Sequence, residues 1–264
     1  MGICVTWRIV AASSVGTSHV TAGKECEDSC LALVEPAGLH PETLTIFVAD
    51  GAGSASHALA GAELAVEAAS AYIKQALGHA DFSLTEALAV DCVQAVRESL
   101  IARAETKELT PRDFACTFLG LLSNDQGTLV MQVGDGGIVV DVGEGLVVPI
   151  APMGGEYANM TTFVTEASAI DQLATRFYPG KAQRAAVFSD GLQRLALNLA
   201  ANSVHEPFFK PFFRTLATAT ASQEEELAPA LARFLASEAV NERTDDDKTL
   251  VVAVLVDEEN RKPA

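Results

Sequence analysis

Four segments of the chain place an aspartate at or next to the end of a strand-like hydrophobic run. They are GKECEDS with Asp28, TIFVADGAGS with Asp50, AAVFSDGLQ with Asp190 and TDDDKTLVVAVLV with Asp246. In two of them the apolar run is followed directly by Asp-Gly. A carboxylate at the end of a buried strand is unfavourable unless a positive group meets it, and several such carboxylates usually share a hard divalent cation. The sequence therefore predicts a metal site.

Ordinary turns are the alternative explanation for each aspartate taken alone. Asp-Gly after a strand is common turn chemistry, and the run Asp245, Asp246, Asp247 could be an acidic loop in which at least one carboxylate is merely solvated. The joint position of the four segments at strand ends favours the metal site.

The elements that must position these residues alternate between strand-rich and helical stretches. Strands are predicted over residues 5–12, 29–34 and 43–49, and helices over 56–77 and from a Ser83/Glu86 capping box to about residue 100. Further strands are predicted in FACTFLGLL, TLVMQVGD, GGIVVDV and GLVVPI, near 161–165, over 185–189 and over 249–256, with a helix from a Ser222/Glu225 capping box to about 237. This order predicts an α+β fold in which two packed antiparallel β-sheets (a β-sandwich) are flanked by helix layers (α-β-β-α).

Composition limits the range of functions. The 264 residues, 49% of them hydrophobic, can form one domain over residues 1–264 with a large core. A net charge of −17 would repel nucleic acid and anionic membrane surfaces, so neither is an expected partner. Five cysteines without CxxC spacing argue against a disulfide framework and indicate a cytoplasmic protein. The oligomeric state stays unknown at this stage.

The motifs ED, VADGAG, FACT, VGDGG, FSDGL and DDDKTLVV resemble, in order and spacing, the metal-dependent serine/threonine phosphatases of the protein phosphatase 2C family, in particular its compact bacterial members. The resemblance spans about residues 15–256. It implies hydrolysis of phosphoserine and phosphothreonine on protein substrates by a metal-activated water, with two Mg²⁺ or Mn²⁺ ions as cofactors. Any one motif would be weak evidence, whereas six in the right order are specific.

The resemblance also implies roles for individual residues. Asp50 is expected to bridge the two ions, and Gly51 to offer its carbonyl oxygen. Asp190 and Asp246 are expected to complete the shell of one ion, and an upstream acidic pair to bind the other directly or through water. The implied catalytic residues are Asp50, Asp190 and Asp246, and the implied metal ligands are Glu27, Asp28, Asp50, Gly51, Asp190 and Asp246.

Two positions near the implied site depart from the family pattern. Ala52 stands where animal-type members carry a histidine proposed as general acid, which leaves protonation of the leaving group to water, with His57 as the less favoured candidate. Gly23 stands where the family has a phosphate-binding arginine. The adjacent Lys24 is the candidate phosphate-binding residue here, although an ammonium acts as a point charge rather than a fork.

A third departure concerns Asp135 in VGDGG, which matches an aspartate that helps to hold a third, weaker ion in many bacterial members. Its partner position is Arg194, whose guanidinium could neutralise Asp135. A third metal at Asp135 is therefore the less favoured prediction, and a hairpin-turn aspartate is the alternative.

Two further functions stay open from the sequence alone. A catalytically weak or inactive phosphatase-like module with a binding or regulatory role would fit the missing histidine and arginine, but the retained carboxylates favour an enzyme. A two-metal hydrolase of nucleotides or nucleic acids ranks last, because the chain lacks the basic surface that would hold such a substrate.

Overall fold

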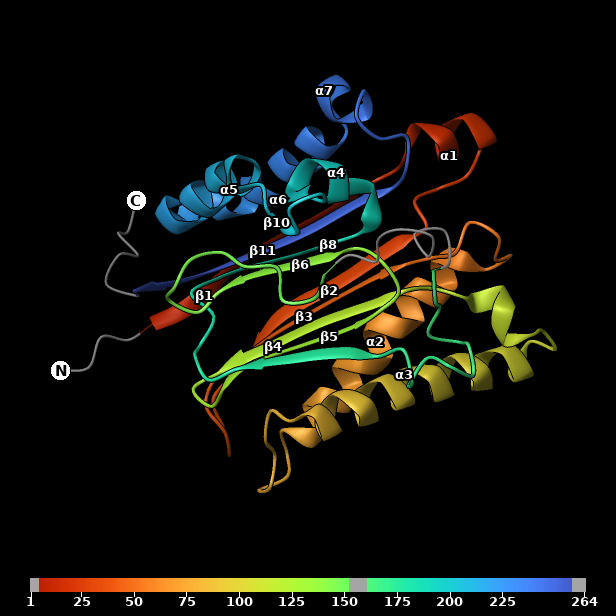
Figure 1. Cartoon of the computed structure of the whole chain (residues 1–264), viewed down its shortest axis with the longest axis horizontal. Coiled ribbons are helices and arrows are strands. Elements are labelled where there is room, and N and C mark those ends of the chain that lie inside the picture. Colours follow the sequence, from red (N-terminus) through yellow and green to blue (C-terminus); the bar gives the residue numbers. More distant parts are fainter. Residues whose placement is uncertain (1–4, 152–160, 258–264) are drawn as a thin grey trace.

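The computed structural model describes residues 5–151 and 161–257. Within these residues, two antiparallel β-sheets pack face to face and helices cover the outer face of each sheet, which gives four layers (Figure 1). The predicted α+β architecture, a β-sandwich flanked by helix layers, is confirmed. None of the helices in the described part of the chain is long and apolar enough to cross a membrane.

The two sheets are formed by strands from both halves of the chain. One has the order β1 (Val5–Ser14), β11 (Lys248–Asp257), β8 (Arg184–Phe188), β6 (Gly137–Asp141). The other has the order β2 (Asp28–Glu35), β3 (Thr43–Asp50), β4 (Phe118–Asn124), β5 (Gly127–Val133), β7 (Ala174–Tyr178). The strand β1 pairs with β11 over its whole length, so the two ends of the described chain are joined by backbone hydrogen bonds.

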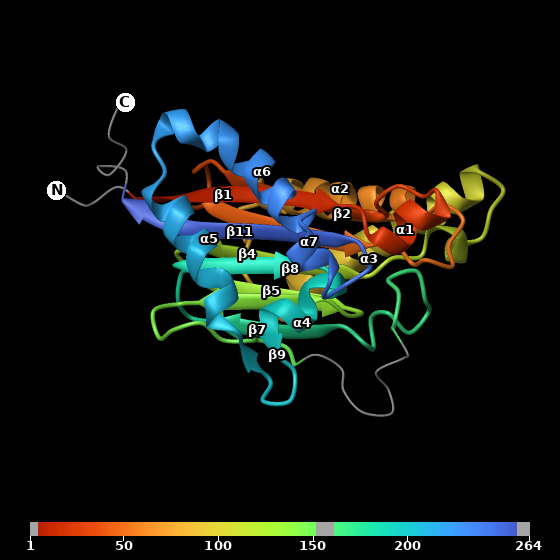
Figure 2. The ribbon, with the colours of Figure 1, turned by 90° about the horizontal axis from the view of Figure 1, so that it is seen from above.

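Each sheet is covered by its own pair of long helices. The helices α2 (Ala58–Ala76) and α3 (Glu86–Thr106) cover the five-stranded sheet, whereas α5 (Glu206–Thr218) and α6 (Ala221–Leu235) cover the four-stranded sheet (Figures 1 and 2). The remaining short elements are α1 (Thr17–Ala22), α4 (Gln193–Ala196), α7 (Glu238–Asn241), two 3-10 turns (Pro111–Phe114 and Asp190–Leu192) and the pair β9 (Leu197–Asn198) and β10 (Ser203–Val204).

The sequence of β3 explains why this strand is apolar on both faces. Successive side chains of a strand point to opposite faces of the sheet. Leu44, Ile46 and Val48 accordingly pack between the two sheets, while Phe47 and Ala49 pack against the helices α2 and α3. All five are fully buried. The strand that ends at Asp50 is therefore held rigidly from both sides.

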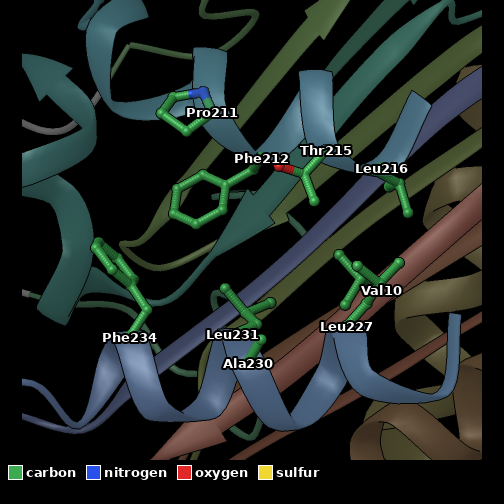
Figure 3. Close-up of a pocket in the computed structure, with 9 residues that line it drawn as sticks. All are labelled: Val10, Pro211, Phe212, Thr215, Leu216, Leu227, Ala230, Leu231 and Phe234. Atoms are coloured by element: carbon green, nitrogen blue, oxygen red, sulfur yellow. The ribbon is translucent and has the colours of Figure 1, made fainter. Parts of the chain in front are cut away.

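The layer of α5 and α6 leaves an apolar groove of about 210 Å³ above β1 (Figure 3). It is lined by Val10, Pro211, Phe212, Thr215, Leu216, Leu227, Ala230, Leu231 and Phe234. The groove shares none of these residues with the polar cavity described below.

Two predicted strands are wrong. The segment GLVVPI makes only a single bridge, between Val147 and Val140, because it follows a tight glycine turn and then leaves the sheet. Residues 161–163 have no regular secondary structure and residues 164–165 begin a turn, and the backbone N–H of Val164 donates to the carbonyl of Cys116. The edge strand is β7 instead. Its exposed residues lack the apolar alternation that identified the other strands.

Both predicted capping boxes are wrong by two residues. The helix α3 begins after Thr85, whose side chain accepts a hydrogen bond from the backbone N–H of Leu88. The helix α6 begins after Thr220, which forms a capping box with Gln223. In both places a threonine competes with a nearby serine as N-cap, and spacing alone does not choose between them.

Candidate metal centre

Several strand ends meet at the end of the sandwich where α1 lies (Figure 1). The strand β3 ends at Asp50, and its antiparallel neighbour β2 begins at Asp28, directly opposite Asp50 in the register. In the other sheet, β8 ends two residues before Asp190, and its neighbour β11 begins two residues after Asp246. Antiparallel pairing thus brings all four predicted aspartates to one end of the fold.

A polar cavity of about 200 Å³ opens at this end. It is lined by His19, Asp50, Gly51, Ala52, Gly53, Thr117, Asp135, Thr161, Phe163, Asp190 and Asp246. Two other predicted site residues lie beside it. Asp28 is only 4% exposed, and Glu27 joins the site through its backbone carbonyl, which accepts a hydrogen bond from the N–H of Gly51 at 3.1 Å.

The glycines of the two Asp-Gly pairs are required by close backbone approach. A Cβ on Gly51 would lie 2.7 Å from the carbonyl oxygens of both Glu27 and Ala58. A Cβ on Gly191 would overlap the carbonyl oxygen of Asp247. Glycine therefore allows the Asp50 turn to pack on the acidic pair, and the Asp190 turn to pack on the C-terminal aspartates.

Burial raises the pKa of three of these carboxyl groups. For Asp50, burial is the largest cause, and the charges of Asp28 and Asp190 add to it. Burial likewise raises the pKa of Asp190, with the charges of Asp135 and Asp246 adding to the effect. For Asp28, burial outweighs the hydrogen bond that the Ser189 hydroxyl donates to Oδ2 at 2.7 Å. The cluster thus carries more negative charge than its own hydrogen bonds can stabilise.

The donor set fits divalent cations. Among the described residues, Oδ1 of Asp28 and Oδ1 of Asp190 are buried oxygens without a hydrogen-bond partner. Such oxygens favour a cationic partner, and Mg²⁺ and Mn²⁺ prefer carboxylate, carbonyl and water oxygens. No three side chains of His, Cys, Asp or Glu in the described ranges converge closely enough to hold an ion by themselves. An ion bound here would keep several water ligands, as Mg²⁺ usually does.

The three consecutive C-terminal aspartates have different surroundings. Asp245 is exposed, and its carbonyl accepts hydrogen bonds from the backbone and hydroxyl of Ser18. Asp246 lines the cavity. Asp247 is 2% exposed and accepts the N–H groups of Gly16 and Glu27, each at 2.6 Å. The expectation of a solvated carboxylate in this run describes Asp245, and Asp247 holds the neighbouring loops together.

Lys24 lies at the rim of the cavity, whereas His57 lies outside its lining. The ammonium of Lys24 contacts both carboxylate oxygens of Glu27, at 3.1 and 3.2 Å, and the carbonyl of Gly53 at 3.3 Å. It is thus at the rim but engaged by an acid. His57 stacks on Phe114 with ring centroids 5.1 Å apart and does not line the cavity.

The expected pairing of Arg194 with Asp135 is wrong. Arg194 is exposed, and none of the ion pairs between described residues joins it to Asp135. Asp135 instead accepts a hydrogen bond from the Thr161 hydroxyl at 2.8 Å and faces the cavity. Arg194 lies on the short helix α4, where its side chain is exposed, and spacing in the sequence does not reveal this.

Five residues of the cavity were not singled out from the sequence: His19, Gly53, Thr117, Thr161 and Phe163. Thr117 belongs to the FACT motif, and its hydroxyl accepts the backbone N–H of Asp50 at 3.1 Å, so a signal for it was present. His19 precedes Glu27 by eight residues and belongs to α1, and no spacing rule connects the two.

Sequence comparison gives two independent matches. A model of the family described as protein phosphatase 2C matches residues 15–236. The chain is also 52% identical over 250 residues to serine/threonine-protein phosphatase 3 of Escherichia coli (strain K12), and the match covers 95% of this chain and 99% of that protein.

Structural comparison finds the same fold in distant proteins. The catalytic domain of the serine/threonine protein phosphatase PstP, solved with two manganese ions, matches with a TM-score of 0.57 and 18% identity over 96% of this chain and 100% of that one. A sex-determining protein of C. elegans matches with a TM-score of 0.63 and 13% identity over 96% of this chain and 65% of that one. At such identities the likeness shows the shared fold.

Proposed function

This chain belongs to the protein phosphatase 2C family, and from that premise we propose that it hydrolyses phosphoserine and phosphothreonine on protein substrates with the help of Mg²⁺ or Mn²⁺. The relative from Escherichia coli is named as a serine/threonine-protein phosphatase, and PstP was solved with two manganese ions. The first relative supports the proposed activity, and the manganese ions of the second support the proposed cofactor.

One observation of the structure supports this function most strongly. Asp50, Asp190 and Asp246 come from different turns and two different sheets, yet all line one polar cavity. Burial and mutual repulsion raise the pKa of the first two, which favours a cationic partner. Two bound ions would supply a water of lowered pKa and would stabilise charge on the phosphoryl oxygens.

We infer the following roles for the chain's own residues. Asp50 would help to hold both ions, and Gly51 would offer its carbonyl oxygen to one of them. Asp190 and Asp246 would help to hold the other ion, with water completing its shell. Thr117 holds the backbone of Asp50 through its hydroxyl. This hydrogen bond helps to keep the Asp50 end of β3 in place.

The acidic pair has the more indirect role. Asp28 is almost fully buried, with one oxygen bound to the Ser189 hydroxyl, so it acts on the second ion through water or as a fixed negative charge. Glu27 is engaged by Lys24, and this ion pair leaves Lys24 only a secondary part in phosphate binding. Since Ala52 carries no titratable group, protonation of the leaving oxygen is left to water.

A third, weaker ion near Asp135 gains support because none of the ion pairs between described residues joins Arg194 to Asp135. Asp135 faces the cavity beside Asp190, and its charge is one of the causes that raise the pKa of Asp190. Thr161 occupies one of its oxygens and leaves the other for a cation.

The compartment, the domain organisation and the partner are inferred from other observations. Cys26, Cys30, Cys92 and Cys116 are all free thiols, which supports a reducing compartment such as the cytoplasm. The pairing of β1 with β11 supports a single domain over residues 1–264. The partner is a phosphorylated protein, and the acidic net charge argues against nucleic acid.

A catalytically weak binding module is the second candidate. It is favoured by Ala52 and Gly23, which replace a histidine and an arginine of the family pattern, and by the engagement of Lys24 with Glu27. The carboxylates that would hold the ions are all present, however, and binding alone would not require them.

Peptide hydrolysis separates the two candidates. Purified protein should release phosphate from a phosphothreonine peptide with Mn²⁺ and not with EDTA, and should leave a phosphotyrosine peptide intact. Asp246→Asn should lower kcat about 100-fold or more, the scale on which loss of a metal-site partner acts. Asp245→Asn is the matched control and should retain wild-type kcat. Binding of the phosphothreonine peptide without release of phosphate in the presence of Mn²⁺ would favour the binding module.

A further inference from the structure

The side chain of His19 faces the same cavity as the aspartates, although no family pattern assigns it a part. It lies on the short helix α1 and is 16% exposed. Of the residues described as lining the cavity, it is the only one whose side chain contains nitrogen. The histidines at positions 40, 57, 79 and 205 do not line it.

The carboxylate of Asp247 lies against one ring nitrogen of His19. Asp247 Oδ2 lies 2.8 Å from Nδ1 of His19. The oxygen is off the N–H direction, so the contact is a close electrostatic one and not a linear hydrogen bond. Asp247 is itself fixed by the backbone N–H groups of Gly16 and Glu27. A carboxylate 2.8 Å from Nδ1 favours the tautomer with the proton on that nitrogen, which would leave Nε2 available to a metal ion.

The other nitrogen, Nε2, then carries the lone pair and lies 3.7 Å from Oε2 of Glu27. In an octahedral site with metal–ligand bonds of about 2.1 Å, two ligand atoms in neighbouring positions are about 3.0 Å apart. Two ligand atoms in opposite positions are about 4.2 Å apart. The separation of His19 and Glu27 falls within this range. Lys24 also contacts Glu27 but is more exposed than the histidine, with 37% of its side chain accessible.

We propose that Nε2 of His19 is a ligand of the ion nearest Glu27, so that Asp247, His19 and the metal form a carboxylate–histidine–metal arrangement. The proposal rests on the two-ion centre proposed above and adds a nitrogen to a shell otherwise made of oxygens. Asp247 is a positioning residue in this arrangement, because it contacts the imidazole and not the ion. There are two competing explanations. His19 could be a purely structural bridge between Asp247 and Glu27, or it could contact the substrate phosphate.

Pulsed EPR of the Mn²⁺-loaded protein without substrate tests the proposal directly. A bonded imidazole nitrogen should give a ¹⁴N hyperfine coupling that changes to the ¹⁵N pattern when only the histidines carry ¹⁵N. His19→Gln should abolish the coupling, and the matched control His57→Gln should keep it. The labelled wild-type protein gives an answer even if His19→Gln fails to fold.

Affinities for a series of metals give a second readout. Nitrogen ligands favour Co²⁺ over Mn²⁺, and Mg²⁺ prefers oxygen. His19→Gln should therefore weaken binding of Co²⁺ most, by about 10-fold or more, Mn²⁺ less and Mg²⁺ least. Equal weakening of all three metals would support the structural bridge and overturn the proposal.

The outcomes distinguish this inference from the proposed function. Bound Mn²⁺ without a histidine coupling overturns the assignment of His19 and leaves the two-ion centre intact. A histidine coupling that appears only after addition of inorganic phosphate overturns it too, and supports a phosphate contact. Absence of Mn²⁺ binding altogether would overturn the proposed function and, with it, the role of His19.

Discussion

Asp28 lies directly opposite Asp50 in the register of β2 and β3. Like charges in directly opposed positions of an antiparallel pair are destabilising, and both of these carboxyl groups are largely buried. The fold therefore keeps a repulsive pair at the end of a well-buried strand. Such an arrangement is explained by a cation that binds there and offsets the repulsion.

The first prediction concerns the stability of the metal-free protein as a function of pH. Burial raises the pKa of Asp190 to about 6 and that of Asp28 to about 7, from 3.8. Between about pH 4 and 7 the folded state thus binds more protons than the unfolded state, so its free energy of unfolding falls as pH rises. The lowered pKa of Asp141 acts in the opposite sense, and its contribution is lost below about pH 4.

Thermal unfolding in EDTA at pH 5.0 and at pH 7.5 checks this prediction. The melting temperature should be lower at pH 7.5, and saturating Mn²⁺ should raise it more at pH 7.5 than at pH 5.0. Stability that is flat or rising over this range in EDTA would contradict the raised pKa values.

The second prediction is that Asp28→Asn stabilises the metal-free protein. An asparagine can still accept the hydrogen bond from the Ser189 hydroxyl while it removes a charge opposite Asp50. The melting temperature in EDTA should rise by about 2–4 °C, which corresponds to about 1 kcal/mol for a chain of this size. The gain on adding Mn²⁺ should shrink. The exposed Asp91→Asn on α3 is the matched control and should change neither value.

The third prediction concerns Arg8, which holds the α5–α6 layer to β1. Its Nη1 donates to the carbonyls of Ala219 at 2.7 Å and Leu216 at 3.3 Å, and its side chain is 7% exposed. Arg8→Met should leave these carbonyls unsatisfied and cost about 2–3 kcal/mol. The melting temperature should fall by about 5–10 °C. Because Arg8 does not line the polar cavity, kcat at 25 °C should not change.

The exposed Arg233→Met on α6 is the control for Arg8 and should unfold near the wild-type temperature. A similar loss in both variants would mean that the contacts of Arg8 contribute little. A drop in kcat for Arg8→Met alone would instead connect the helix layer to the active site.

The fourth prediction follows from Ala52. Without a general acid, kcat should rise steeply across a series of aryl phosphates as the leaving phenol becomes more acidic, and should be lowest for a phosphoserine peptide. His57→Gln should leave the series unchanged, because His57 lies outside the cavity. Similar kcat values for phosphoserine peptide and an activated aryl phosphate would mean that another residue supplies the proton.

The architecture was predictable because the strands are strongly apolar and the Asp-Gly turns mark where they end. The sequence TIFVADG predicts both a buried strand and a polar end for it, and the structure has β3 ending at Asp50. The edge strand β7 escaped prediction, since ATRFY has no fully buried residue and lacks apolar alternation.

The candidate site was predictable where chemistry follows strand ends, and not where it depends on loops. Asp50, Asp190 and Asp246 line one cavity as a consequence of antiparallel pairing. Arg194, which is exposed, and His19, which lines the cavity, lie on short helices of four and six residues. Their orientation depends on tertiary contacts such as the one between His19 and Asp247, which are 228 positions apart and leave no local signal.

Asp50→Asn tests the central claim most directly, because the account assigns this carboxylate to both ions. Calorimetric titration with Mn²⁺ should find at least two ions per wild-type chain and weaker, incomplete binding to Asp50→Asn. The kcat of the variant on a phosphothreonine peptide should fall by several orders of magnitude even at saturating Mn²⁺, since the charge that neutralises two dications is lost. Near-wild-type turnover of Asp50→Asn at saturating Mn²⁺ would contradict the two-ion assignment.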